Sequence, residues 1–367
     1  MKIALINFWL NNNYGGNLQR YALVKVLQNL GHKVVHINLR QELSIDWFRL
    51  SPHIIFRILK KMIGLQHAPI LYEYKIHQKY YENIQLIESF YNRYIPHSYQ
   101  VKHLSDYSDY DKFDAIIVGS DQIWRPWSPM GYVYSNFFLD FLPINNRQIR
   151  IAYGISLGTR ENEYSSDDII KLRKFYNAFK AVSVREESAL SLFNSYGWSS
   201  PLATTVLDPV LLLNKSDYIK LMPLFRKKLD MFCYVLDIND LKVNFIKQCS
   251  LSFNMKFVIE SAEDNAELSL KQWLSCFYKS KFIITDSFHG MVLSIVFHKP
   301  FFVIGNERRG MSRFQSLLSI VNLQSRLLNE NNLDVIPVLN NIDWNIVDDK
   351  LKSWRDISID FLNTNLK

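Results

Sequence analysis

The chain has 367 residues, 48% of them hydrophobic and 21% charged, so it can fold into more than one core and is not a disordered protein. It has no apolar run long enough to span a bilayer, and its net charge of +8 favours anionic partners without selecting one. Three scattered cysteines without metal-ligand spacing favour a cytoplasmic protein and argue against a disulfide framework or a zinc site.

The N-terminal residues predict a β-α-β unit. KIALINF at residues 2–8 has the apolar character of a buried strand, and no cleavage site follows it, so we expect a strand and not a signal peptide. In residues 17–30 apolar side chains share one helical face, and Gly31 supplies a C-terminal stop. KVVHINL at residues 33–39 then resumes as a strand.

A basic amphipathic helix is predicted within residues 47–65, at the run HIIFRILKKMIGL. Arg57, Lys60 and Lys61 fall on one helical face, and apolar residues fill most of the remainder. Such a helix suits the surface of an anionic membrane, which would make the protein peripheral on the inner face of the cell membrane. The alternative is a helix whose broad apolar face packs on its own domain.

Short apolar strands separated by helix-length segments are predicted along the rest of the chain. They lie at 113–120, 149–156 and 181–186 in the first half, and at 231–237, 256–260, 281–286 and 300–305 in the second. This alternation is typical of parallel sheets covered by helices on both faces. We therefore predict an α/β protein of two Rossmann-like domains, residues 1–210 and 211–340, with parallel sheets facing across a cleft. Residues 341–367 are expected to form a helical segment that packs back on the first domain.

Parallel sheets bind ligands at the carboxyl ends of their strands, so the residues that follow each predicted strand are candidates for a site. On this ground we single out Asn13, Tyr14, Gly15 and Asn17, then Ser120, Asp121, Gln122 and Trp124, then Arg185, then Ser287, His289 and Gly290, and finally Arg308, Arg309 and Arg313.

His289 is predicted to lie in the first turn of a helix that begins near Phe288. Asp286 or Ser287 would cap this helix, and Gly290 would permit close approach of a ligand or another chain segment. The N-terminal end of a helix attracts anions, so a bound phosphate or carboxylate would favour the protonated imidazole and make it an acid. The alternative is a second capping group or a hydrogen-bonded core histidine.

Each of the other candidates also has a purely structural alternative. Arg185 would serve either as a fork for a carboxylate or phosphate, or as a salt-bridge partner of Glu186 or Glu187. The arginines at 308, 309 and 313 would form an anion site or a solvated basic face. Asp121 would hold a sugar hydroxyl or simply shape a turn. Trp124 and Trp127 would stack on a sugar or lie in the core.

Several familiar sites are excluded by missing motifs. The segment after the first strand is not a dinucleotide fingerprint, and no Walker A pattern occurs, which argues against a dehydrogenase or an NTPase. No Gly-x-Ser-x-Gly elbow is present either. No recognised nucleic-acid-binding motif accompanies the positive charge, so we expect no nucleic-acid partner.

Taken together, several motifs resemble those of the polysaccharide pyruvyltransferase family. They are NYGGNLQRYAL at 13–23, FDAIIVGSDQIW at 113–124, SVRE at 183–186, LDPVLLL at 207–213 and TDSFHGMVLSIVFHKPF at 285–301. They occur in order over nearly the whole chain, except for residues 40–110 and the last forty or so. The resemblance implies a GT-B-like pair of Rossmann-like domains.

The same resemblance implies transfer of pyruvate from phosphoenolpyruvate to two hydroxyls of a sugar, giving a cyclic ketal and free phosphate. The acceptor would be a bacterial surface polysaccharide or its lipid-linked precursor, and no cofactor or metal would be needed. His289 would be the catalytic acid or base with Asp121 beside it. Arg185, Ser287, Gly290 and the three later arginines would bind the donor. Asn13, Tyr14, Gly15, Asn17, Ser120, Gln122 and Trp124 would face the acceptor.

The chain departs from the family pattern at one position. Well-studied branches carry arginine two residues before the histidine, where this chain has Ser287. We expect Arg308, Arg309 or Arg313 to replace that arginine from the next strand end. Two other functions stay open at this point: a GT-B glycosyltransferase with a nucleotide-sugar donor, and a non-enzymatic family member. The oligomeric state is left open.

Overall fold

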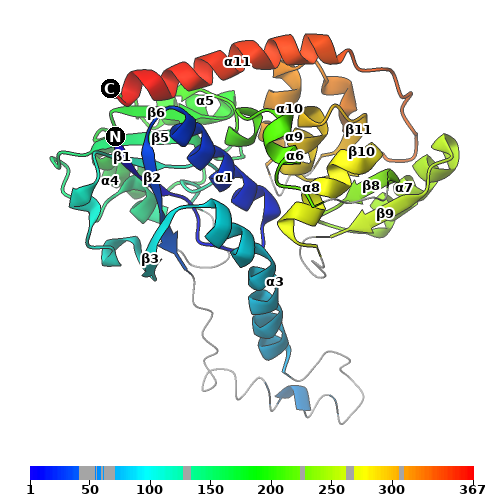
Figure 1. Cartoon of the computed structure of the whole chain (residues 1–367), viewed down its shortest axis with the longest axis horizontal. Coiled ribbons are helices and arrows are strands. Elements are labelled where there is room, and N and C mark those ends of the chain that lie inside the picture. The colour runs from blue at the N-terminus through cyan, green and yellow to red at the C-terminus, as the bar shows by residue number, and fades with distance from the viewer. Residues whose placement is uncertain are drawn as a thin grey trace.

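The structure is a computed structural model that describes residues 1–40, 54, 56–58, 61, 71–126, 134–223, 228–261, 268–305 and 310–367. Within this part, two parallel sheets lie side by side, each flanked by helices (Figure 1). The predicted α/β architecture with two parallel sheets is confirmed.

The first sheet has seven strands in the order β3-β2-β1-β4-β5-β6-β7, all parallel. The strands are β1 Lys2–Ile6, β2 Lys33–Leu39, β3 His97–Val101, β4 Ala115–Val118, β5 Ile149–Ile155, β6 Ala181–Val184 and β7 Thr204–Thr205. Its helices are α1 Tyr14–Asn29, α3 Tyr72–Tyr94, α4 Ser166–Tyr176 and α5 Glu187–Ser195, with short 3₁₀ turns at Leu104–Asp106, Tyr110–Lys112 and Tyr134–Phe138.

The second sheet has five parallel strands in the order β12-β11-β10-β8-β9. They are β8 Leu229–Tyr234, β9 Phe257–Glu260, β10 Ser280–Thr285, β11 Phe301–Ile304 and β12 Leu327–Leu328. The later helices are α6 Lys215–Ile219, α7 Asp240–Phe253, α8 Leu270–Lys279, α9 Phe288–Val296, α10 Met311–Ile320 and α11 Trp344–Asn365, with 3₁₀ turns at Pro209–Leu211 and Gln324–Arg326.

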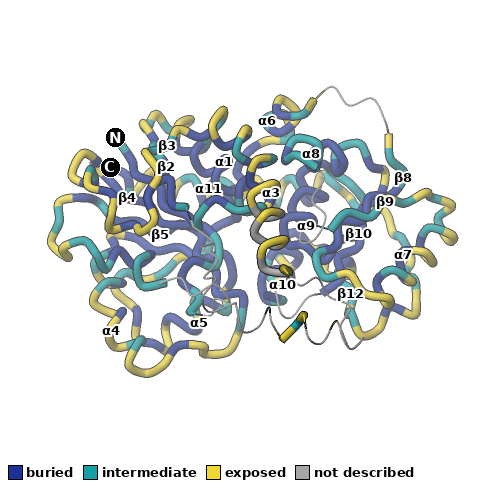
Figure 2. The backbone as a smooth tube through the Cα atoms, turned by 90° about the horizontal axis from the view of Figure 1, so that it is seen from below, coloured by how far each residue is buried: buried dark blue, intermediate teal, exposed yellow. Residues whose placement is uncertain are grey.

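The central strands are apolar because helices cover both faces of each sheet. Strand β4, AIIV, is buried along its whole length, and so is β11, FFVI. In register, Ile3 of β1 lies between Val34 of β2 and Ala115 of β4. Figure 2 shows this burial concentrated in the sheets and the helices against them, while α4 and α7 carry exposed residues on their outer sides.

One apolar cluster continues from the first domain into the second, so the two halves share a core. It includes Leu18 of α1, Trp273 of α8 and Met291 of α9. The Tyr14 ring stacks on Trp273 with centroids 5.2 Å apart, which ties the start of α1 to α8. The other faces of the two sheets have apolar clusters of their own.

The C-terminal helix α11 runs across both halves of the molecule (Figure 1). Ser358 Oγ accepts a hydrogen bond of 2.9 Å from the Leu207 amide, and the Phe361 ring contacts Tyr153 at 6.1 Å. Near its end, Lys180 Nζ donates to the Asn365 carbonyl at 3.0 Å. The helix therefore packs back on elements of the first domain.

Most of the predicted basic helix lies outside the described residues. Of residues 47–65, only 54, 56–58 and 61 are described. In the part of the chain that the structure describes, no helix combines the length and apolar character needed to cross a membrane. Membrane docking by this segment stays a prediction.

Candidate active site

A network of ionisable side chains, most of them buried, lies at the carboxyl ends of strands in the first sheet, where the second domain meets it. It consists of Asp121 after β4, Arg185 after β6, Asp208 after β7, His289 in the first turn of α9 and Arg313 in α10. Three of these five residues come from one domain and two from the other. The network therefore forms only when the domains are in contact.

Arg185 is the centre of this network. Its guanidinium donates to Asp208 and, over 2.9 Å, to Asp121 Oδ1, while the Phe288 ring lies 5.3 Å from it. Burial opposes its charge, but the two carboxylates outweigh burial and raise the pKa of Arg185. Its Nε has no hydrogen-bond partner among the described residues.

The predicted alternative for Arg185, a salt bridge to its neighbour Glu186 or Glu187, is wrong. Glu186 instead uses one carboxylate oxygen to accept hydrogen bonds from Ser156 Oγ, Leu157 N and Gly158 N, at 2.8 to 3.0 Å. The successive side chains of Arg185 and Glu186 thus have different partners.

Asp208 joins the network and was not among the predicted site residues. It accepts from Arg185, from Gln19 Nε2 of α1 and, over 2.9 Å, from the Val210 amide. Burial would raise the pKa of this carboxyl, but Arg185 and His289 hold it well below its usual range. The available signal was the family-like motif LDPVLLL that contains Asp208, since the short strand β7 before it was not predicted. The following proline favoured its interpretation as a turn.

His289 projects from the first turn of α9 toward Asp208 and is only 6% exposed. Its Nε2 lies 3.7 Å from Asp208 Oδ2, too far for a hydrogen bond, and that nitrogen has no hydrogen-bond partner in the described part of the chain. On the other side, a Cβ at Gly15 would lie 2.1 Å from His289 Nδ1. Helix α1 therefore needs glycine there to pack against the imidazole.

The N-terminal cap of α9 is Ser287 and not His289 or Asp286. Ser287 Oγ accepts from the Gly290 amide at 3.3 Å. Asp286 instead accepts from Lys242 Nζ at 2.8 Å and from two backbone amides. A Cβ at Gly290 would meet Thr285 Oγ1 at 2.3 Å, so this glycine serves the packing of β10 on α9. Both residues thus make internal contacts, and their predicted role in donor binding stays a prediction.

Asp121 occupies an unusual backbone position between the two arginines. Its φ of 90° lies in the region that side chains rarely adopt, which is the type of conformation found at functional sites. Asp121 Oδ1 forms ion pairs with the guanidinium of Arg185 at 2.9 Å and with Arg313 Nη1 at 3.3 Å. Burial would raise the pKa of Asp121, but the two guanidiniums lower it on balance. The carboxylate is therefore held ionised.

Arg313 is the one of the three later arginines that the structure describes. Its guanidinium lies 5.2 Å from the centre of the Phe288 ring, and the guanidinium of Arg185 contacts the same ring. Burial lowers the pKa of Arg313 to about 10, so it remains a cation at neutral pH. Arg308 and Arg309 lie outside the described residues, as does Trp127.

Several predicted acceptor residues make contacts within the fold. Trp124 is fully buried, donates from Nε1 to the Phe137 carbonyl and stacks on Phe138, so its core alternative is the correct one. Tyr14 donates to the Leu268 carbonyl at the domain contact. Asn17 Nδ2 bonds the carbonyls of residues 11 and 13 at 2.8 Å. These three side chains are buried and hydrogen-bonded within the fold, and their predicted contact with the acceptor stays a prediction.

The remaining acceptor candidates lie near a small cavity of about 20 Å³ beside the network. Asn13 caps α1 by accepting from Gly16 N at 3.0 Å, and it lines this cavity together with Ser120 and Asp121. Ser120 Oγ is buried and has no partner among the described residues. Gln122 Nε2 donates to the Leu157 carbonyl at 3.4 Å.

Charge balance decides what this network can do. Two guanidiniums face two carboxylates, and the N-terminal ends of α1 and α9 add positive potential. An anion that entered the network would replace Asp121 or Asp208 as the ion-pair partner of the arginines. In the described ranges, no group of three or more His, Cys, Asp and Glu side chains could hold a metal ion.

Comparison with known proteins decides the family. A family model for polysaccharide pyruvyl transferases matches residues 13–308. The chain belongs to the polysaccharide pyruvyl transferase family. The matched range includes every residue of the network except Arg313, which follows it closely. No curated protein matches the chain significantly.

Among solved structures, the chain is similar to sugar-nucleotide enzymes at low identity. The S. aureus MnaA–UDP complex is 11% identical, with 90% of this chain and 86% of that chain covered and a TM-score of 0.48. The UDP-GlcNAc 2-epimerase from Neisseria meningitidis is 12% identical over 99% and 100% of the chains, with a TM-score of 0.43. The E. coli ADP-heptose heptosyltransferase II is 12% identical over 97% and 99%, with a TM-score of 0.37.

Proposed function

We propose that this protein transfers pyruvate from phosphoenolpyruvate to two hydroxyls of one sugar, forming a cyclic ketal and releasing phosphate. The observation that carries the proposal is the convergence of Arg185 and Arg313 on a single oxygen of Asp121, at 2.9 and 3.3 Å, in the same network as His289. The sugar would belong to a bacterial surface polysaccharide or its lipid-linked precursor.

The donor's charges match this pair of arginines. Phosphoenolpyruvate carries a carboxylate and a phosphate, and guanidinium forks bind both groups well. Because Arg185 and Arg313 already share one anionic oxygen, a donor anion can take the place of the Asp121 carboxylate between them. Arg313 would thereby bind the donor in place of the arginine that well-studied family branches carry at the position of Ser287.

His289 would move the proton that the reaction requires. As an imidazolium it donates a proton to the methylene carbon of the donor, which becomes a methyl group while a sugar hydroxyl adds to the neighbouring carbon. The C–O bond to phosphate then breaks, and the second hydroxyl closes the ketal. One hydroxyl proton ends on the methyl group through His289 and the other on the released phosphate, so atoms and charges balance.

Fixed charges would stabilise the transition state. The carboxylate and leaving phosphate stay paired with Arg185 and Arg313, which are buried and need no reorganisation. Asp208 Oδ2 lies 3.7 Å from Nε2 of His289, on the side of the imidazole that faces the network. Asp121, freed from the arginines, would be available to accept a hydrogen bond from the sugar.

The donor is the point to test. Thermal unfolding of the protein should shift upward with phosphoenolpyruvate and not with nucleotide sugars, and phosphate should appear when a lipid-linked glycan is added. Mass spectrometry of that glycan should show the gain of one pyruvyl ketal. Stabilisation by a nucleotide sugar alone, with no phosphate release, would instead support a glycosyltransferase.

A lipid-linked acceptor would bring the protein to the inner face of the membrane. The predicted basic helix is our candidate for that contact. Charge reversal of Arg57, Lys60 and Lys61 to Glu should abolish sedimentation with anionic liposomes while the thermal unfolding midpoint stays unchanged. Unaltered sedimentation would assign the segment to packing on its own domain.

A further inference from the structure

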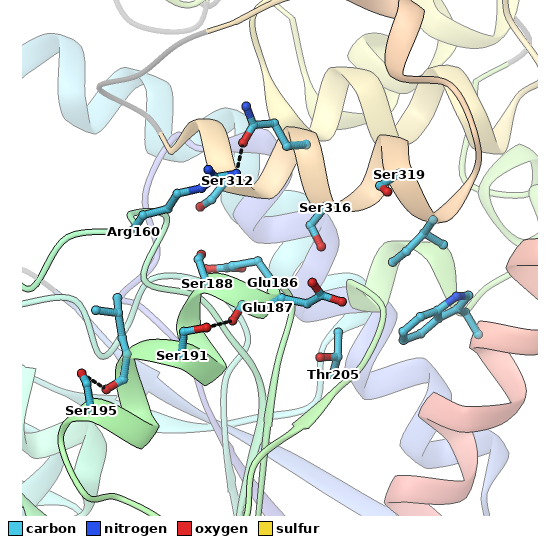
Figure 3. A pocket seen from close by; sticks show the side chains of 14 residues that line it. Arg160, Glu186, Glu187, Ser188, Ser191, Ser195, Thr205, Ser312, Ser316 and Ser319 are labelled. Atoms are coloured by element: carbon cyan, nitrogen blue, oxygen red, sulfur yellow. Dashed lines mark hydrogen bonds between the residues drawn. The ribbon is translucent and has the colours of Figure 1, made fainter.

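A cavity of about 810 Å³ lies between α5 and α10, close to the ionic network (Figure 3). None of Asp121, Arg185, Asp208, His289 and Arg313 lines it. It nevertheless adjoins them closely, because Glu186 follows Arg185 and Ser312 precedes Arg313 in the chain. Ser316 Oγ also donates to the Arg185 carbonyl at 3.4 Å.

The two main walls of the cavity are stripes of serine. Ser188, Ser191 and Ser195 recur along one face of α5, and Ser312, Ser316 and Ser319 along one face of α10. Small residues on facing helices ordinarily permit close packing, but here the cavity separates the two stripes (Figure 3). Ser191, Ser195 and Ser316 donate to the carbonyls of Glu187, Leu192 and Arg185. Ser188 Oγ and Ser312 Oγ have no hydrogen-bond partner among the described residues.

Buried polar atoms in these walls lack partners. Glu186 is 1% exposed, and its Oε2 has no hydrogen-bond partner within the described residues, although Oε1 accepts three. Ser312 is 7% exposed, and its Oγ also has no hydrogen-bond partner within the described residues. Buried polar groups are almost always satisfied, so these two call for a ligand or water that supplies hydroxyl groups.

The charge of the cavity argues against an anionic ligand. Among the described residues, Glu186 and Glu187 line it together with one cation, Arg160, which donates to Gln315 Oε1 at 2.7 Å. The half-buried Trp354 of α11 adds an aromatic surface. Carboxylate oxygens, serine hydroxyls and an indole ring together suit a neutral sugar, which offers hydroxyl donors at its edge and an apolar face. The volume is in the range of small-ligand pockets, about 300–1,000 Å³.

We propose that this cavity is a carbohydrate subsite that binds neutral sugar residues of the acceptor glycan adjacent to the residue that receives pyruvate. The proposal rests on the proposed function, since it assigns the sugars to that acceptor. The walls come from both domains, so a bound glycan would hold the two halves together while the ionic network binds the donor on the other side of Arg185.

Binding can be measured without any pyruvyl transfer. Saturation-transfer NMR with a panel of neutral disaccharides of glucose, galactose and mannose should detect binding to the wild-type protein in the absence of phosphoenolpyruvate. Ser191→Gln and Ser316→Gln each insert a longer side chain from one wall and should weaken that binding at least about tenfold. Ser252→Gln, on the exposed face of α7, is the matched control and should bind as the wild type does.

The wall tryptophan provides a second, independent readout. Trp354→Ala should weaken sugar binding, whereas Trp344→Ala, in the same helix but stacked on His298, should not. The proposal is overturned if no disaccharide binds, if the serine variants bind as tightly as the control, or if phosphoenolpyruvate competes with the sugar. Sugar binding that depends on Ser191 without any phosphate release would contradict the proposed function and leave the subsite standing. Phosphate release with sugar binding unaffected by these variants would support the proposed function and contradict the subsite.

Discussion

Gly15 and His289 face each other across the two domains so closely that a Cβ at position 15 would lie 2.1 Å from the imidazole Nδ1. Each residue lies in the first turn of a helix, α1 in one domain and α9 in the other. The glycine therefore sets where the imidazole lies relative to Asp208. The position of the proposed acid depends on a residue in the opposite domain that has no side chain.

Gly15→Ala should reduce turnover by roughly 100-fold, because displacement of a reacting group by about 1 Å has an effect of that size. The added methyl group must move either the imidazole or α1, and each change alters the distance from His289 to Asp208. Phosphate release under saturating donor is the measurement. Gly16→Ala is the matched control, since its Cβ would meet only the Asn13 side chain, at 3.5 Å. Equal turnover in the two variants would show that the contact is not needed.

Asp208→Asn should destabilise the fold by about 3–5 kcal/mol, because it leaves the buried guanidinium of Arg185 without one of its carboxylates. Unfolding in urea, followed by circular dichroism, gives the difference in free energy. Asp109→Asn removes the partner of the exposed Lys112 and should leave the urea midpoint essentially unchanged. A midpoint for Asp208→Asn equal to that of the control would mean that the pair adds nothing to stability.

Much of the fold could be predicted because central parallel strands are continuous apolar runs. Strands β1, β2, β4, β5, β6, β9 and β11 fall within predicted segments, while β8 and β10 overlap theirs but begin two residues and one residue earlier. The strands missed were β3, β7 and β12, which lie at or next to sheet edges. The sequence of β3, HSYQV, is largely polar because an edge strand is partly exposed, and β7 and β12 have two residues each. These segments are strands only because they pair with an adjacent strand, and that pairing is set by the tertiary structure.

The site could be predicted in part for the same reason. Strand ends located Asp121, Arg185 and His289, which the structure brings into one network. The partners of each side chain could not be predicted, since Asp208 and Arg185 lie 23 residues apart and Arg313 reaches Asp121 from the other domain. Tyr14 and Trp124 have the right location in sequence for a ligand site. Their burial depends on packing against distant segments.

Stability should depend on pH in the acid range because the pKa values of Asp121 and Asp208 are lowered in the folded protein. Above the ordinary aspartate value of 3.8 both carboxylates are ionised in the folded and unfolded states, and their contribution is complete. As the pH falls below that value, the unfolded chain takes up protons first, and the contribution is lost through the lowered folded pKa values.

The comparison of variants isolates this effect from that of other carboxylates. The difference in urea midpoint between the wild type and Asp208→Asn should be constant from pH 7 to about pH 5 and should shrink below about pH 4. A difference that grew as the pH fell would contradict the assignment of an ionised Asp208 in the folded state.

Arg313→Lys and His289→Asn should separate donor binding from proton transfer. Lysine keeps the charge but loses the fork that meets Asp121 Oδ1 and the planar contact with Phe288, so the KM for phosphoenolpyruvate should rise about tenfold or more with a smaller change in kcat. Asparagine at 289 fits the space against Gly15 but cannot donate a proton as an acid, so kcat should fall by about 10²–10⁴ while donor-induced thermal stabilisation persists. Arg147→Lys, at an exposed arginine that bonds the Asp111 carbonyl, serves as the control and should change neither constant. If Arg313→Lys lowered only kcat, or His289→Asn abolished donor binding, the roles assigned to these two side chains would have to be exchanged.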